Sequence, residues 1–299
     1  MMKRLLLIAA LAVASVAQAQ YPERPVRMVV PYSPGGLVDI VARYVTSKLS
    51  WRTVVENKVG AGGLIAGREV ERAKPDGYTL LVGNVSPNGV NPAWFHQPPE
   101  DGNLRLAPVA MIGGQPFMLL TKDEVANAHA VIAAVRAGKP YGTDGVGGIG
   151  NLSMESIAPG GVQVPYKGTP PLVTDIAAGL IYAGFAPAVV AAPWMGKGTL
   201  RAVAQSSATR SPQFPDIPTL RELGYSYDSE AWVGLFAPEG TPPAIITAWN
   251  LAVAEVLRDS TWFRSNGIVT RVMTPDEFGK FVRDEQTKYR AIASRMTDK

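Results

Sequence analysis

Few side chains in this 299-residue sequence could carry out catalysis. It has no cysteine, which excludes thiol nucleophiles, thiolate metal sites, disulfides and a lipid-carrying N-terminal cysteine. His96 and His129 are the two imidazoles, and both lie in polar or irregular segments, so we predict no metal site. The sequence has no G-x-S-x-G motif, and nothing marks neighbouring carboxylates such as Asp228 and Glu230 as an acid/base pair. We therefore expect a protein that is not an enzyme and needs no cofactor.

A glycine corner is the first candidate for a binding site. In "VVPYSPGGLVDIVARYV" (residues 29–45) a β-branched strand runs through Gly35 and Gly36 into an apolar pattern with helical spacing. A helix N-terminus presents unpaired N–H groups and a positive dipole end, and glycine lets a small anion approach them. Spacing alone leaves two readings open, tight helix–strand packing and an anion site. Asp39 either pairs with Arg43 and complements the helix dipole, or contacts a ligand.

A second glycine-rich stretch, "GVGGIG" (residues 145–150), formally matches G-x-G-x-x-G. A dinucleotide site needs a hydrophobic strand before this motif, a good helix after it and an acidic residue about 20 positions on. Here "GKPYGTD" is a poor central strand, and Asp175 already lies in another expected helix. We therefore reject a dinucleotide site, and either a ligand-facing loop or a surface loop remains. Lys167 is either a solvated lysine or a cation at the rim of an anion site.

The elements around these stretches alternate between strand and helix, which predicts a parallel α/β sheet. Residues 106–120 read as two strand segments with a break at the Gly-Gly pair, followed by a weak helix at 125–137. Thr241-Pro242 opens a long helix, and Thr274-Pro275-Asp276-Glu277 forms a capping box for another. The first expected elements are strand 25–32, helix 37–49, a strand within "TVVENKVGAGG", helix 64–72 and strand 78–82.

The N-terminal residues read as a targeting segment and not as part of the fold. Lys3 and Arg4 precede an apolar run, and Ala17-Gln18-Ala19 fits a small-x-small cleavage site, so we predict a signal peptide over residues 1–19. The formal net charge is +4, with no basic run, which argues against nucleic acid as a partner. The remaining chain of about 280 residues exceeds the usual single-domain size, so two lobes are expected.

Together these segments resemble the extracytoplasmic solute-binding receptors of tripartite tricarboxylate transporters, the Bug family. The resemblance runs in order from Tyr21 to the C-terminal helix. The segments that carry it are "YPERPVRMVVPYSPGGLVDIVARYVTSKL", "VVENKVGAGG", "KPDGYTLLVG", "VPYKGTPPLVTDIAAG", "LRAVAQSSATRSPQFPDIPTLRELGY" and "WVGLFAPEGTP".

The resemblance implies a type II periplasmic-binding-protein fold, with two α/β lobes joined by two crossover strands that close on a ligand. Lobe 1 would comprise residues 20–112 and 234–299, and lobe 2 residues 113–233. The implied function is a periplasmic receptor that captures a small organic carboxylate and delivers it to the membrane subunits of a tripartite transporter. A monomer is expected. The alternatives are a non-transporting ligand sensor on the same scaffold and, less favoured, an exported hydrolase.

The resemblance also implies the ligand-binding residues. In the family the turn that matches residues 32–39 grips a ligand carboxylate, largely through backbone N–H groups. Turns that match residues 83–92, 141–151, 165–168 and 184–188 add contacts. The residues carried over are Tyr32, Ser33, Pro34, Gly35, Gly36 and Asp39, and further Asn84, Asn88, Thr143, Lys167 and Gly168.

This sequence departs from the family pattern mainly in the second lobe. "GVGGIGN" replaces a loop usually rich in Ser and Thr, and Gly184 stands where a carboxylate that engages a ligand's amino group is often found. An amino-acid ligand is therefore less expected. Val85 replaces a frequent hydroxyl in the first lobe, and "NLSMESIAPGGVQVPYKG" lacks roughly two turns of helix, at ~3.6 residues per turn.

Overall fold

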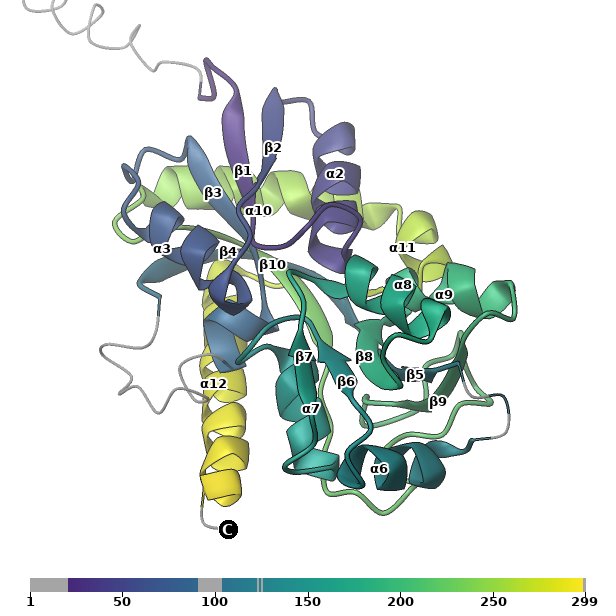
Figure 1. The fold of residues 1–299 in the computed structure, drawn as a ribbon. Helices are drawn as coiled ribbons and strands as arrows, with labels where there is room; N and C mark the ends of the chain where they lie inside the picture. The colour runs from purple at the N-terminus through teal and green to yellow at the C-terminus, as the bar shows by residue number, and fades with distance from the viewer. Residues whose placement is uncertain (1–20, 91–103, 123, 125, 298–299) are drawn as a thin grey trace, which may run out of the picture.

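The structure is a computed structural model that describes residues 21–90, 104–122, 124 and 126–297. Two mixed sheets lie side by side, each with helices packed against it (Figure 1). The six-stranded sheet has the order β11-β4-β10-β3-β1-β2, and the five-stranded sheet has the order β7-β6-β8-β5-β9. We call the half around the six-stranded sheet lobe 1 and the other half lobe 2. The predicted signal peptide lies outside the described residues.

Lobe 1 has a parallel core of β1, β2 and β3, to which β10 adds in the antiparallel direction. Helix α2 packs on β1, β2 and β3, while α3 packs on β3 and β1. The capping box predicted for α12 is present, since the Thr274 N–H donates to the Glu277 carboxylate at 2.8 Å. The elements are β1 (Val26–Val30), α2 (Leu37–Lys48), β2 (Thr53–Asn57), turn η1 (Ala61–Gly63), α3 (Leu64–Glu71), β3 (Thr79–Asn84), turn η2 (Ser86–Val90), β4 (Leu106–Gln115), β10 (Ala231–Pro238), α10 (Pro243–Arg258), α11 (Thr261–Ser265), β11 (Val269–Thr270) and α12 (Pro275–Thr297).

In lobe 2, β6 pairs in parallel with β7 and β8, while β5 runs antiparallel to β8 and β9. Helices α8 and α9 pack on β5 and β8. Pro170 and Pro171 occupy the first turn of α8, where a missing N–H costs no helical hydrogen bond. The elements are β5 (Phe117–Thr121), α6 (Ala128–Arg136), β6 (Tyr141–Thr143), α7 (Ile149–Ile157), β7 (Gln163–Pro165), α8 (Thr169–Ala178), β8 (Ala183–Pro187), α9 (Ala188–Gly196) and β9 (Arg201–Gln205).

The prediction of a strand break at Gly113 and Gly114 is wrong. Strand β4 runs through both glycines, and the chain leaves lobe 1 at Pro116. A Cβ on Gly113 would lie 2.6 Å from the Val269 carbonyl oxygen, and one on Gly114 would lie 2.4 Å from a Glu230 oxygen. The glycines therefore make room for neighbouring chain segments and do not interrupt the strand.

The stretch judged a poor central strand also forms part of a sheet. Strand β6 lies between β7 and β8, and the Tyr141 side chain is fully buried. Helix α7 then begins after the glycine-rich loop and buries Ile149, Leu152 and Met154 completely. The short helix expected from the sequence therefore still contributes to the core of lobe 2.

Candidate functional site

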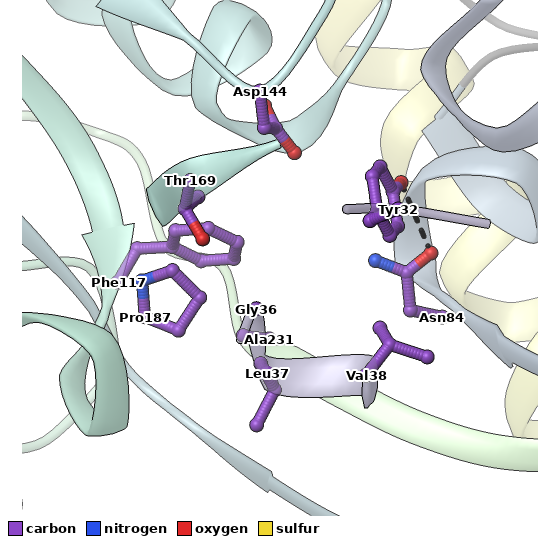
Figure 2. A pocket seen from close by; sticks show the side chains of 10 residues that line it. All are labelled: Tyr32, Gly36, Leu37, Val38, Asn84, Phe117, Asp144, Thr169, Pro187 and Ala231. Carbon is purple, nitrogen blue, oxygen red and sulfur yellow. Dashed lines mark hydrogen bonds between the residues drawn. The ribbon is translucent and has the colours of Figure 1, made fainter. Parts of the chain in front are cut away.

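A small cavity lies between the two lobes where β1 turns into α2. Its volume is about 20 Å³, which is room for one water-sized group. Figure 2 shows Tyr32 and Asn84 on one side, Phe117, Thr169 and Pro187 on the other, and Gly36 and Leu37 at the start of α2 between them. The residues that line it are Tyr32, Gly36, Leu37, Val38, Asn84, Phe117, Asp144, Thr169, Pro187 and Ala231.

The lobes touch each other around this cavity. The Ser33 N–H donates to the Lys167 carbonyl oxygen at 3.3 Å, and the Ile149 N–H donates to Ser86 Oγ at 3.1 Å. A Cβ on Gly168 would lie 2.6 Å from Ser33 Oγ. This conformation is therefore closed, and a ligand larger than water can enter the small cavity only if the lobes separate.

The first turn of α2 lines the cavity. Gly35 has φ +81°, a conformation that disfavours any side chain, whereas Gly36 is extended at φ −77° and serves as the N-cap without a side-chain cap. Leu37 and Val38 follow and line the cavity. The N–H groups of a first helical turn have no partner within their own helix, so this end is available to an anion.

Asp39 stabilises the turn between β1 and α2 through hydrogen bonds. Its carboxylate accepts hydrogen bonds from the Gly35 N–H at 3.0 Å, Arg43 Nε at 3.0 Å and Asn57 Nδ2 at 2.9 Å. Burial alone would raise the pKa of Asp39, but these hydrogen bonds outweigh it and lower the pKa overall. Asp39 is absent from the cavity lining. The structure thus contains the pairing with Arg43 that the sequence left open.

Tyr32 and Asn84 form the lobe 1 wall of the cavity. The Tyr32 hydroxyl lies 3.2 Å from both the Gly62 carbonyl oxygen and Asn84 Oδ1 (Figure 2). Burial raises the pKa of Tyr32 strongly, with a further contribution from the nearby charge of Asp144. The phenol is therefore neutral and acts as a hydrogen-bonding group.

In lobe 2 the N-terminus of α7 is already occupied by the protein's own side chains. The Ile149 N–H is bound by Ser86 from lobe 1, and the Gly150 N–H donates to Asp144 Oδ1 at 3.1 Å. Asp144 is 5% exposed. Burial raises its pKa to about 6, although the hydrogen bond from Gly150 opposes the shift.

A second cavity of about 310 Å³ adjoins the first and shares Tyr32 and Asp144 with it. Turn η1 forms its lobe 1 side, and Val146 and Lys167 lie on its lobe 2 side. Its size suits a small organic molecule. Lys167 therefore faces this larger space and not the small cavity.

The structure brings together part of the predicted set. Tyr32, Gly36 and Asn84 line the small cavity, and Lys167 lines the larger one. The remaining predicted residues lie beside the cavities and are absent from both linings. These are Ser33, Pro34, Gly35, Asp39, Asn88, Thr143 and Gly168.

Besides Asp39, two of these neighbouring side chains form hydrogen bonds with the protein around them. Asn88 Nδ2 donates to the Asn84 carbonyl oxygen at 2.9 Å, and Thr143 Oγ1 accepts from Gln163 at 2.8 Å. Ser33 Oγ is buried and has no hydrogen-bond partner among the described residues. Pro92 and Asn91, at the end of the predicted turn 83–92, lie outside the described residues.

Four cavity residues, Asp144, Thr169, Phe117 and Pro187, were not predicted individually, although Asp144 and Pro187 lie within the turns 141–151 and 184–188 that the family resemblance implied. Two of them had a local signal. Asp144 is the acidic residue of the glycine-rich loop, and Thr169 directly follows the "PYKG" turn. Phe117 lies opposite Pro187 in a pair of strands 70 positions apart, so no local pattern indicates Phe117.

The described residues contain no cluster of three or more His, Cys, Asp or Glu side chains that could hold a metal ion. His129 lies near Tyr225, with 3.4 Å between Nδ1 and the hydroxyl, and His96 falls outside the described part of the chain. None of the helices in the described ranges is long and apolar enough to cross a membrane.

Comparison with known proteins identifies the family. Residues 38–297 match the family described as the tripartite tricarboxylate transporter family receptor. The chain belongs to this family. It is 32% identical to Protein BugT of Bordetella pertussis, over 93% of this chain and 91% of that protein. Members of this Bug/TctC group are periplasmic solute-binding receptors, so the predicted family is confirmed.

Solved structures confirm the fold as that of a two-lobed periplasmic binding protein. MatC from Rhodopseudomonas palustris with bound malate superposes with a TM-score of 0.84 and 28% identity, covering 91% of this chain and 100% of that one. Another R. palustris structure, with adipate, gives a TM-score of 0.85 and 28% identity, covering 93% and 98%. Malate and adipate are both dicarboxylates.

Proposed function

We propose that this Bug-family receptor captures a small organic carboxylate between its lobes in the periplasm and hands it to the membrane subunits of a tripartite transporter. The observation that carries the proposal is the uncapped start of α2, which opens into the interlobe cavity. The amides of that turn need no charged side chain to hold an anion, because the helix end itself favours negative charge. The malate and adipate bound by related receptors support the same ligand class.

The proposed lobe 1 contacts are the backbone of residues 33–38 and the side chains of Tyr32 and Asn84. Asp39 acts indirectly by holding the turn through Gly35 and Asn57. Asn88, Thr143 and Gly168 support the walls, and Lys167 meets the part of a longer ligand that reaches the larger cavity. The resemblance implied lobe limits at residues 20–112 with 234–299, and 113–233. Because β4 ends at Gln115 and β10 begins at Ala231 in the sheet of lobe 1, we propose limits at residues 20–115 with 231–299, and 116–230.

The proposed mechanism is lobe closure without chemistry. A ligand that binds the closed form more tightly than the open form shifts the population toward closure. Contacts between the lobes, such as the hydrogen bond from the Ile149 N–H to Ser86 Oγ, stabilise the closed form. Residues 1–19 would direct export and be removed, and the receptor would act as a monomer.

A melting-temperature screen tests this function. The purified chain from residue 20 is mixed with mono- and dicarboxylates, and with sugars and basic amino acids as negative controls. A ligand at 100 times its Kd adds about 2.7 kcal/mol of stability, which is a shift of several degrees. A panel of organic acids that leaves the Tm unchanged would contradict the proposal. Loss of uptake of the identified acid on deletion of the receptor gene tests the transporter role.

A further inference from the structure

Asp144 places an acidic side chain in the wall of both interlobe cavities. Within the part of the chain that the structure describes, it is the one charged residue that lines the small cavity. The proposed function puts a second negative charge, the ligand's carboxylate, in the same space. In the small cavity, whose volume is about 20 Å³ in this conformation, the two carboxylates would lie close together.

The position of the Asp144 side chain is fixed by its surroundings. Oδ1 accepts the Gly150 N–H at 3.1 Å, and the described residues contain no hydrogen bond from another residue to Oδ2. The glycine-rich loop gives the carboxyl group its room, because a Cβ on Gly148 would lie 2.5 Å from Oδ1. One oxygen is therefore held by α7, and the other is left for a ligand.

The groups that face Asp144 do not neutralise it. Tyr32, from the β1–α2 turn, is a neutral phenol, while Asn84 at the end of β3 and Ser86 at the start of η2 are uncharged. Lys167, from the β7–α8 turn, shares the larger cavity with Asp144, but the described residues contain no ion pair between them, and the pKa of Asp144 is raised and not lowered. Two carboxylates in a shared dry site do not both ionise readily, and a single proton between them removes the repulsion.

We propose that Asp144 is a specificity-determining residue that binds the ligand through a proton shared with the ligand's carboxylate. This inference rests on the proposed function and deepens it. Such a carboxyl group favours organic acids without an amino group, because an ammonium would instead require ionised Asp144. The raised pKa of Asp144 supports this role, since a proton is available near neutral pH.

The proposal fixes the sign of the pH dependence. Asp144 has a pKa of about 6 in the free protein, and an anionic ligand beside it raises that pKa further. Between these two values, binding takes up a proton, so affinity falls as pH rises. Below pH 6 the residue is already protonated and affinity no longer changes through it.

The test compares wild type with Asp144→Asn by calorimetry at pH 5.5, 6.5, 7.5 and 8.5. The titrants are succinate and adipate, followed by each further acid that shifts the Tm. We expect the wild-type Kd to rise by up to about tenfold per pH unit above pH 6, with uptake of about one proton. The variant should change less than about twofold over the same range, because its amide donates an N–H at every pH.

The possible failures can be told apart. Equal pH dependence in both proteins, or wild-type affinity that rises with pH, would overturn the role of Asp144 and leave the receptor function standing. Absence of binding by both proteins to every acid at every pH would contradict the receptor function itself. Circular dichroism of Asp144→Asn at pH 7 confirms that the variant is folded.

Discussion

Helices α2 and α7 begin with the same backbone geometry but use their N-termini differently. Gly36 precedes α2 with φ −77° and ψ 167°, and Gly148 precedes α7 with φ −77° and ψ 165°. Both starts lie at the interface between the lobes. The first-turn amides of α7 donate to Ser86 and Asp144, whereas among the described residues no side chain accepts a hydrogen bond from the first-turn amides of α2.

The difference shows that a glycine corner becomes a binding site only if the protein leaves it open. Each corner has an aspartate nearby, but the two carboxylates are used in opposite ways. Asp39 turns away from the cavity to Arg43 and Asn57, and its pKa is lowered. Asp144 lines the cavity, and its pKa is raised. Lobe 1 thus offers donors to a ligand, and lobe 2 offers a carboxyl group.

The largest expected effect tests whether the glycine corner before α2 is the one that binds the ligand. Gly36→Val places methyl groups beside the amides of α2, and we expect at least 100-fold weaker ligand binding, about 2.8 kcal/mol. The cost to folding should be about 1 kcal/mol, because a Cβ on Gly36 meets only ordinary contacts of 3.5 Å and longer. Calorimetry and urea unfolding measure the two quantities.

Gly196→Val is the matched control, since a Cβ there has no heavy atom within 4 Å and the site lies at the end of α9. It should bind ligand like the wild type. Equal ligand affinity in Gly36→Val and Gly196→Val would remove the α2 corner from the binding site.

The second prediction concerns the glycine corner before α7, which is filled by the side chains of Asp144 and Ser86. Because Asp144 has a pKa raised on folding to about 6, its contribution to stability is fully present below its ordinary pKa and is lost as pH rises through 6. The free energy of unfolding of the wild type should therefore fall, relative to Asp144→Asn, by roughly 2–3 kcal/mol between pH 4 and 7. Urea unfolding at unit pH steps measures this difference, and a constant difference would show that Asp144 is not buried as described.

A third prediction uses alanine at the two N-cap glycines. Gly148→Ala should destabilise the fold by roughly 2 kcal/mol, because its Cβ would lie 2.5 Å from Asp144 Oδ1. Gly36→Ala has the same backbone geometry and should cost well under 1 kcal/mol. Most of the cost at Gly148 should vanish in an Asp144→Ala background. If Gly148→Ala and Gly36→Ala lower the free energy of unfolding by the same amount, the corners before α7 and α2 do not differ in packing.

The same pair of corners shows how much the sequence could predict. Periodicity and turn residues located β1, α2, α3 and the capping box of α12, because each depends on residues close together in the chain. Chain length predicted two lobes, and the family resemblance implied the type II periplasmic-binding-protein fold, which the solved relatives confirm. The glycine corner at Gly36 was predicted, like β1 and α2, from residues close together in the chain.

What the sequence could not predict depends on distant segments. Gly113 and Gly114 read as a break because their partners, Val269 and Glu230, lie more than 100 positions away. The use of "GVGGIG" was likewise hidden, since the motif does not say that Asp144 folds back onto the helix it introduces. Two glycine motifs of similar composition therefore received similar interpretations, although one is open and the other filled.

The smallest expected effect tests the support behind the open corner. Asp39→Asn removes the ion pair with Arg43 while leaving an oxygen for the Gly35 N–H, and should cost about 1 kcal/mol at pH 7. Because the pKa of Asp39 is lowered on folding, its stabilisation is present above its ordinary pKa and is lost as pH falls through the lowered value. The free-energy difference between wild type and Asp39→Asn should therefore shrink in acid, which is opposite in sign to the pH dependence expected for Asp144.

Asp76→Asn is the control, since its ion pair with Arg24 is exposed and should contribute at most about 0.5 kcal/mol. If both variants gave the same small change without pH dependence, Asp39 would not hold the turn, and the open corner would owe its shape to the glycines alone.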